Sequence, residues 1–212
     1  MAAPDSSLPP ALEPVSTWRQ PEPPPAGPQR TALIGEVAAR ITALSAGRLR
    51  VAVDGLTGSG KTSFGHELAA AVRGLGRPTL RASFDDFKNP WDEARQLGYD
   101  RLSGEGYYRN AYDFASARDL LLVPAGPQGS GNVVLRAHSS GITGSGWTCR
   151  PKSRWPAGSP RDTAAEGGAD AATRLHRDRY YAAEIIYLAE VGPRAHADLV
   201  IDNEVLRRPL IL

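Results

Sequence analysis

The sequence predicts an α/β domain of three layers, in which helices cover both faces of a mostly parallel β-sheet. Short apolar runs of strand length alternate with longer stretches of helical periodicity, which is typical of strand–helix–strand units. A glycine-rich turn stands between the first expected strand and the next helix. Residues 137–160 interrupt the alternation and lack apolar periodicity, so we expect coil there and a sheet that is incomplete in its centre.

The chain begins with a proline-rich segment that we expect to be a disordered leader, because residues 1–29 offer few apolar side chains for a core. The remainder, residues 30–212, is long enough for one domain with a substantial core. Residues 31–46 place apolar side chains on one face and predict an amphipathic helix, which Gly47 would end.

The first expected strand covers residues 50–54, and the helix after the glycine-rich turn covers residues 63–73. The elements expected farther along are a strand over 78–83, an irregular aromatic stretch over 88–112, a helix over 113–123, a short strand over 132–136, a long helix over 170–190 and a last strand over 197–202. Ligands bind such sheets at the carboxyl ends of the strands. We therefore expect functional residues directly after the first two strands.

The composition excludes several classes of protein. A net charge of +2 gives no strongly basic face, so nucleic acid is not expected as a partner. The single cysteine, Cys149, cannot form an internal disulfide or a cysteine-based metal site, which fits a reducing cytoplasm. No apolar run reaches the length of about 18 residues that a membrane span needs. We expect a soluble cytoplasmic protein without a membrane partner, and the sequence leaves its oligomeric state open.

Residues 55–62 fit the phosphate-binding pattern G-x-x-x-x-G-K-[ST], also called Walker A, where a strand is expected to pass into a helix. Its glycines allow the backbone to turn and point successive N–H groups at the phosphates of a nucleotide. Lys61 would neutralise the β- and γ-phosphate oxygens, and the Thr62 hydroxyl would bind Mg²⁺. The alternative is an accidental match in a glycine-rich turn. The candidate ATP-binding residues here are Gly55, Thr57, Gly58, Ser59, Gly60, Lys61, Thr62 and Ser63.

Two carboxylates, Asp85 and Asp86, follow the strand expected at 78–83. Transfer of a phosphoryl group to an alcohol needs a group that accepts the hydroxyl proton, and an aspartate in this place suits that task. The alternative is that the two aspartates cap a helix or a turn. The phosphate-binding pattern upstream favours the catalytic interpretation.

Six segments carry a further resemblance: Val51–Gly55, Arg81–Phe87, Glu105–Tyr108, Ala111–Asp113, Tyr187–Glu190 and Ala197–Asn203. With them the chain resembles the uridine kinase family of P-loop nucleoside kinases, close to bacterial members described as nucleoside or nucleotide kinases. The resemblance implies a three-layer P-loop NTPase fold with Asp85 as the catalytic base. It also implies that Tyr112 and Asp113 lie near the nucleoside, with Asp113 toward the ribose, and that Lys88 stands where the family places His or Tyr against the base.

The resemblance is lost between residues 136 and 160. Members of the family place there a hydrophobic strand ending in Asp-Gly, a helix and another strand, and that acid anchors Mg²⁺ through water. This chain has no such acid there, and Asp202, at the end of the last strand, is expected to be structural. We therefore hypothesise an internally deleted or frame-shifted nucleoside kinase. Where the similarity returns, Arg161 and Asp162 resemble part of an arginine-bearing lid over the phosphates; for Arg161, a solvated side chain is the alternative.

The expected function is phosphorylation of a nucleoside 5′-hydroxyl, that of uridine or cytidine, with ATP and Mg²⁺ as cofactors and Asp85 and Lys61 as catalytic residues. Lys88, Tyr112 and Asp113 would bind the nucleoside. One alternative is a P-loop kinase for another small alcohol, such as pantothenate or a sugar phosphate, because related kinases share both motifs. Another is a catalytically inactive ATP-binding remnant, because the central segment is missing. A guanine-nucleotide switch is disfavoured, since no lysine lies in an Asn/Thr-Lys-x-Asp motif.

Overall fold

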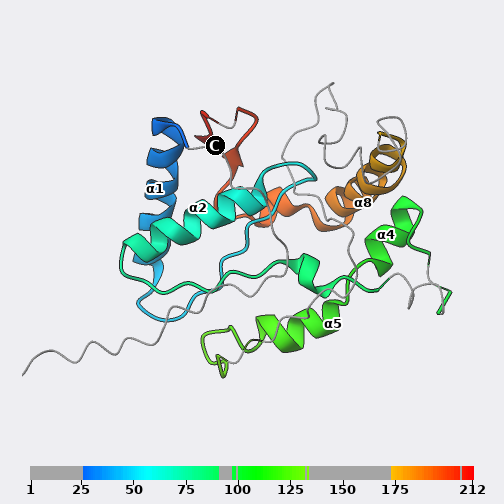
Figure 1. Ribbon diagram of the computed structural model, residues 1–212, viewed down its shortest axis with the longest axis horizontal. Helices are drawn as coiled ribbons and strands as arrows, with labels where there is room; N and C mark the ends of the chain where they lie inside the picture. Colours follow the sequence, from blue (N-terminus) through cyan, green and yellow to red (C-terminus); the bar gives the residue numbers. More distant parts are fainter. Residues whose placement is uncertain (1–25, 91–96, 99, 132, 134–172, 206) are drawn as a thin grey trace, which may run out of the picture.

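The computed structural model describes residues 26–90, 97–98, 100–131, 133, 173–205 and 207–212. Within these ranges the protein is mostly helical, and its sheet has two short antiparallel strands (Figure 1). Strand β1 (Ile201–Asp202) pairs with β2 (Leu210–Ile211), with Ile201 opposite Ile211. The prediction of a mostly parallel, three-layer P-loop fold is therefore wrong for the part of the chain that the structure describes.

The two segments that were expected to begin this sheet, residues 50–54 and 78–83, are not β-strands. Val51 is 50% exposed and Leu80 is 41% exposed, whereas the strands of a parallel sheet are covered on both faces. A short apolar run indicates a strand only if another strand lies beside it, and this pairing is a non-local property of the chain. The last expected strand, residues 197–202, is reduced to β1.

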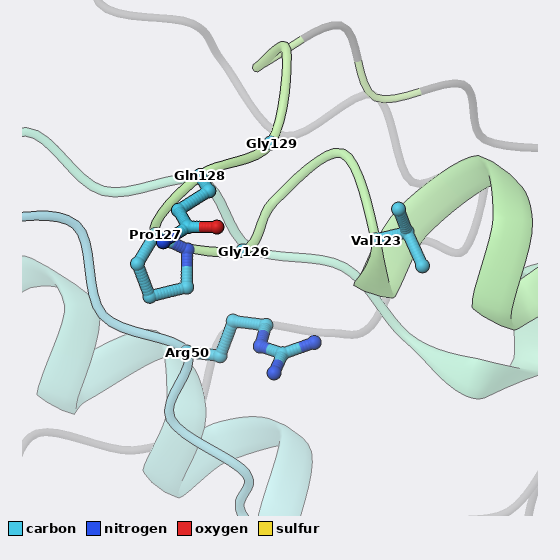
Figure 2. Close-up of a pocket in the computed structure, with 6 residues that line it drawn as sticks. All are labelled: Arg50, Val123, Gly126, Pro127, Gln128 and Gly129. Atoms are coloured by element: carbon cyan, nitrogen blue, oxygen red, sulfur yellow. The ribbon is translucent and has the colours of Figure 1, made fainter.

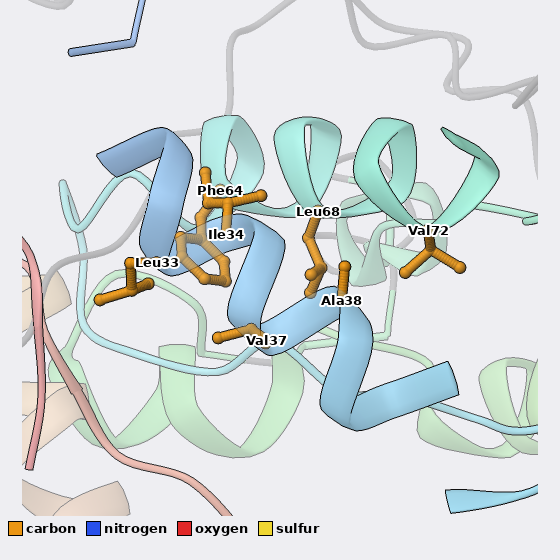
Figure 3. Close-up of a cluster of buried hydrophobic side chains, with 7 residues drawn as sticks. All are labelled: Leu33, Ile34, Val37, Ala38, Phe64, Leu68 and Val72. Atoms are coloured by element: carbon orange, nitrogen blue, oxygen red, sulfur yellow. The ribbon is translucent and has the colours of Figure 1, made fainter. Parts of the chain in front are cut away.

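Helices α1 (Pro28–Leu44) and α2 (Lys61–Gly74) pack on each other and form the largest apolar cluster. Figure 3 shows their facing side chains, which recur at helical spacing on each helix. The predicted helix over 31–46 is confirmed with shifted ends, because Pro28 at its first turn suits a helix start and the chain becomes extended at Ser45. The cluster consists of Leu33, Ile34, Val37, Ala38, Phe64, Leu68 and Val72.

A second group of helices lies along the other side of the molecule (Figure 1). It contains α4 (Gly104–Asn110), α5 (Phe114–Ala117) with the π-helical turn η2 (Arg118–Leu122), the π-helical turn η3 (His176–Tyr181) and α8 (Ala182–Val191). The helix predicted over 113–123 is confirmed by α5 and η2, and the described part of the helix predicted over 170–190 is confirmed by η3 and α8.

Helix α4 lies within the stretch that was predicted to be irregular. Ser103 caps its first turn, because the Ser103 hydroxyl accepts a 3.0 Å hydrogen bond from the Gly106 N–H. The helix packs closely on the start of α8, where a Cβ added at Gly104 would overlap the side chain of Ala182. Two of the aromatic residues of this stretch, Tyr107 and Tyr108, therefore belong to a helix that is fixed by its cap and its packing.

Arg50 satisfies a carbonyl at the C-terminal end of the α5–η2 helix, and Arg48 binds the loop that follows it. The Arg50 guanidinium donates to the Leu122 carbonyl at 2.9 Å, and that of Arg48 donates to the Gly129 carbonyl at 2.9 Å. Carbonyl groups at a helix end lack intrahelical partners, so cationic donors satisfy them well. Figure 2 shows the pocket beside this contact, which contains none of the predicted site residues and is lined by Arg50, Val123, Gly126, Pro127, Gln128 and Gly129.

Three predicted regions lie wholly or mostly outside the described residues: residues 1–25 of the leader over 1–29, the interrupting segment 137–160, and most of the strand over 132–136. The predicted end of the leader is wrong, because α1 already begins at Pro28. Within the described ranges, no helix is long and apolar enough to cross a bilayer.

Candidate functional site

Residues 55–62, the glycine loop, turn directly into α2. Gly58 and Gly60 have φ angles of +80° and +74°, a left-handed conformation that side chains disfavour, so glycine is required at both positions. Lys61 and Thr62 are the first two residues of the helix, and the Gly60 carbonyl accepts the 2.8 Å hydrogen bond from the Phe64 N–H. N–H groups in the first turn of a helix have no intrahelical partner and favour anions. The helix predicted after the loop is confirmed by α2, whereas the strand predicted before the loop is not formed.

The Lys61 side chain lies along the same loop. Its ammonium group donates a 3.3 Å hydrogen bond to the Gly55 carbonyl, six residues earlier in the chain. A Cβ added at Gly55 would lie 3.0 Å from the Ser59 hydroxyl oxygen, so the start of the loop lies close to its middle. The arrangement places a cation and the positive end of α2 on one short loop.

Helix α8 contributes a carboxylate to the glycine loop. The Thr57 main-chain N–H donates a 2.6 Å hydrogen bond to the carboxylate of Glu184, which is only 4% exposed. Near it, the Tyr187 hydroxyl donates a 2.6 Å hydrogen bond to Asp54. Sequence reasoning missed Glu184, although an acidic residue next to Ala183 and Ile185 in an apolar helix was an available signal.

The loop is also held from the C-terminal part of the chain. The side-chain amide of Asn203 donates a 2.8 Å hydrogen bond to the Ser59 carbonyl, and its oxygen accepts a 2.8 Å hydrogen bond from Arg30. Ser59, Asn203 and Arg30 are all buried, with exposed fractions of 6%, 8% and 5%. Asn203 was part of the resemblance to the uridine kinase family, but no role was predicted for it.

Three of the residues predicted to act on the acceptor lie together beside the short 3-10 turn η1 (Phe84–Phe87). The Lys88 ammonium group is 2.8 Å from a carboxylate oxygen of Asp85, and the Tyr112 hydroxyl donates a 3.4 Å hydrogen bond to the same oxygen. An isolated antiparallel bridge between Lys88 and Tyr112 holds the two main chains together. We call these three residues the Asp85 cluster.

The electrostatics of the Asp85 cluster keep its two proton donors protonated. Burial acts to lower the pKa of Lys88, but nearby Tyr107 and Asp85 outweigh it, and the pKa lies above its ordinary value. Burial raises the pKa of Tyr112 well above its ordinary value, and the neighbouring Tyr107 and Asp85 raise it further. At neutral pH Asp85 therefore faces an ammonium group and a neutral phenol.

The capping alternative, stated for Asp85 and Asp86, holds for Asp86, and Asp113 is a cap as well. Asp86 accepts a 3.3 Å hydrogen bond from the Ser83 N–H in a capping box at η1 and is 2% exposed. Asp113, expected near the ribose, caps α5 by accepting from the N–H of Ser116 at 2.9 Å and from its hydroxyl at 2.6 Å. One carboxylate oxygen of Asp85 instead contacts Lys88, and the other accepts a 3.4 Å hydrogen bond from the Ser83 hydroxyl.

Helix α8 contacts both the glycine loop and the surroundings of the Asp85 cluster. Ala183 packs with Tyr107 and Ala111, next to Glu184, which reaches the loop. The ring of Tyr107 in turn meets the edge of the Tyr112 ring, with centroids 6.3 Å apart. Residues from three distant parts of the sequence thus meet around one helix.

One further prediction has no counterpart in the described residues. Arg161 and Asp162, expected in a lid, lie outside them. Within the described ranges, no group of three or more His, Cys, Asp and Glu side chains could hold a metal ion. A Mg²⁺ site of the kind expected would therefore depend on the Thr62 hydroxyl together with phosphate oxygens and water, which are common Mg²⁺ ligands.

No protein-family model matches the chain, and neither a curated protein nor a solved structure matches it.

Proposed function

We propose that the protein is a kinase that transfers the γ-phosphoryl group of Mg-ATP to the 5′-hydroxyl of a nucleoside, that of uridine or cytidine. The observation that carries the proposal is the glycine loop, whose left-handed Gly58 and Gly60 lead into α2 with Lys61 and Thr62 in its first turn. The resemblance of the sequence to uridine kinases supports the choice of acceptor. A cytoplasmic location belongs to the same proposal.

The glycine loop supplies the groups that a triphosphate needs. Its N–H groups and those of the first turn of α2 would donate to the phosphates, where the helix end favours negative charge. Lys61 would move from the Gly55 carbonyl to the β- and γ-phosphate oxygens, because a charged phosphate is a stronger acceptor than a carbonyl. Thr62 would bind Mg²⁺, which neutralises charge on the same oxygens.

The Asp85 cluster supplies the group that accepts the proton. As the nucleoside oxygen bonds to the γ-phosphorus, its proton passes to the Asp85 carboxylate, and the bond from that phosphorus to the bridging oxygen breaks to leave ADP. Tyr112, whose hydroxyl already donates to Asp85, would hold the carboxylate in place. Lys88 lies 2.8 Å from the same carboxylate and would have to yield part of this contact to the acceptor hydroxyl.

The same ion pair favours a second candidate, a nucleotide-binding protein without turnover. The Lys88 and Asp85 side chains are only 15% and 18% exposed, so an incoming hydroxyl competes with a largely dehydrated ammonium group for Asp85. In this case the glycine loop binds ATP, and the Asp85 cluster has a structural role and no catalytic one.

Incubation of the full chain with γ-labelled ATP, Mg²⁺ and separate acceptors tests the proposal. The acceptors are uridine, cytidine, pantothenate and a sugar phosphate, and ATP binding is measured in parallel by calorimetry. Labelled uridine or cytidine monophosphate is the expected product, and it should disappear in Asp85→Asn. Binding without any labelled product supports the second candidate, whereas transfer to pantothenate or the sugar phosphate alone would replace the nucleoside as the acceptor. Absence of ATP binding contradicts all of these functions.

A further inference from the structure

A buried side-chain amide outside the glycine loop fixes one peptide group within it. The amide nitrogen of Asn203 lies 2.8 Å from the Ser59 carbonyl oxygen, although the two residues are 144 positions apart in the chain. Ser59 precedes Gly60, which has a φ angle of +74° and whose carbonyl accepts the Phe64 N–H of α2. The hydrogen bond from Asn203 therefore reaches the point where the loop becomes a helix.

The orientation of the Asn203 amide is set by a cation. Arg30 donates to the amide oxygen of Asn203 at 2.8 Å, so the oxygen faces the guanidinium and the nitrogen faces Ser59. Arg30 is itself held by both oxygens of Glu67 on α2, at 2.7 and 3.0 Å, and its guanidinium lies 5.7 Å from the centre of the Phe64 ring. Bidentate contacts of this kind fix an arginine firmly.

The geometry of the peptide bond links this contact to the interior of the loop. In a trans peptide, the carbonyl and the following N–H point in opposite directions. Because Asn203 holds the Ser59 carbonyl on one side, the N–H of Gly60 is directed to the other. A peptide flip at this point would cost the buried Ser59 carbonyl its hydrogen bond, which opposes the change.

We propose that Asn203, oriented by Arg30, is a positioning residue that presents the Gly60 N–H of the glycine loop to a phosphate. The inference rests on the proposed function, because it assigns Asn203 to the binding of the triphosphate. Its effect falls on nucleotide affinity, since Asn203 contacts the loop and has no contact with the Asp85 cluster among those the structure describes.

Asn203→Asp is the sharpest test. The carboxylate still accepts from Arg30, but it cannot donate to the Ser59 carbonyl and repels it. We expect the Kd for Mg-ATP, measured by titration calorimetry on the full chain, to rise about tenfold, which corresponds to about 1.4 kcal/mol. The KM for ATP should rise in the same proportion, while kcat at saturating ATP stays within about twofold, because the Asp85 cluster is intact.

Glu67→Gln is the matched control. It removes the charge of the Arg30 partner but keeps a side-chain oxygen that can accept from Arg30, so the Asn203–Ser59 contact stays in place. The variant should lower the melting temperature with little change in ATP affinity. A purely structural role for Asn203 predicts instead that both variants lose affinity only in proportion to their loss of stability. If Asn203→Asp does not fold, Asn203→Ser, a small neutral variant without the amide donor, takes its place.

Unchanged ATP affinity in Asn203→Asp overturns the inference and leaves the proposed function standing. If Asn203→Asp does not fold, unchanged affinity in Asn203→Ser has the same meaning. Absence of Mg-ATP binding to the unsubstituted chain overturns both. Loss of affinity in the Asn203 variant together with normal affinity in Glu67→Gln supports the inference.

Discussion

The main-chain N–H of Thr57 donates a 2.6 Å hydrogen bond to the carboxylate of Glu184, so a negatively charged oxygen already occupies one amide of the glycine loop. The two residues are 127 positions apart, and Glu184 is 4% exposed. A carboxylate in this position satisfies the same kind of donor that a phosphate oxygen would use. A bound triphosphate must therefore either displace Glu184 or tolerate a like charge beside it.

We expect Glu184→Gln to bind Mg-ATP more tightly than the unsubstituted chain, by roughly tenfold or about 1.4 kcal/mol. The glutamine oxygen can still accept from the Thr57 N–H, but the repulsion between the carboxylate and the triphosphate is removed. Calorimetric titration at low and high salt measures the change, which should shrink as salt screens the charge.

Glu190→Gln is a suitable control for this measurement, because Glu190 lies on the same helix but is exposed and pairs with Arg109. Its affinity for Mg-ATP should equal that of the unsubstituted chain. Weaker binding by Glu184→Gln would show that the carboxylate supports the loop rather than competing with the ligand.

Asp85→Asn should abolish phosphoryl transfer while Mg-ATP still binds, because the substitution removes the proton acceptor and leaves the glycine loop unchanged. It should also lower the free energy of unfolding by about 1–3 kcal/mol, since Lys88 then lacks the carboxylate that it contacts at 2.8 Å. Urea denaturation and product formation are measured on the same preparation.

The double variant Asp85→Asn with Lys88→Met separates the two effects. Replacing the ammonium group by an apolar side chain removes the uncompensated charge, so stability should recover in part while transfer remains absent. Transfer at the normal rate by Asp85→Asn would exclude Asp85 as the base.

The longer helices α1, α2, α5 with η2, and η3 with α8 were predictable because their signals are local, whereas α4 was missed. The apolar spacing in α1 and α2 marks the faces that pack together, and Gly192, at a φ angle of +55°, ends α8 in a left-handed conformation that favours glycine. The sheet was not predictable in this way, because residues 50–54 and 78–83 could form strands only with neighbours that are distant in the sequence. The error in fold class thus came from pairing, which short apolar runs do not encode.

The same distinction between local signals and non-local contacts applies to the candidate site. The conformations of Gly58 and Gly60 follow from a local motif. The family resemblance implied that Asp85 and Tyr112 both serve the nucleoside, and the two side chains are in contact. The contacts made by Glu184 and Asn203 depend on how the C-terminal part of the chain packs on the loop. No spacing in the sequence indicates either of these contacts.

Lys61→Ala should weaken Mg-ATP binding by about a hundredfold, because each phosphate contact of the ammonium group is charge-assisted and lies at a helix end. Its effect on stability should be small, since the hydrogen bond to the Gly55 carbonyl is long, at 3.3 Å. Arg40→Ala, which removes an exposed cation paired with Glu36 on α1, is the control and should leave affinity unchanged. Equal affinity of Lys61→Ala and the unsubstituted chain would contradict ATP binding at the glycine loop.

Gly104→Ala should lower the free energy of unfolding by about 1–3 kcal/mol, because the added methyl group overlaps Ala182 and forces α4 away from α8. Gly35→Ala is the matched control, since Gly35 lies inside α1 and an added Cβ there has no atom within 4 Å. That variant should gain about 0.5–1 kcal/mol from the higher helix propensity of alanine. Urea denaturation measures both changes, and stabilisation by Gly104→Ala would show that α4 does not pack on α8 as described. Because α8 also carries Glu184, we expect Gly104→Ala to alter Mg-ATP affinity as well, whereas Gly35→Ala should not.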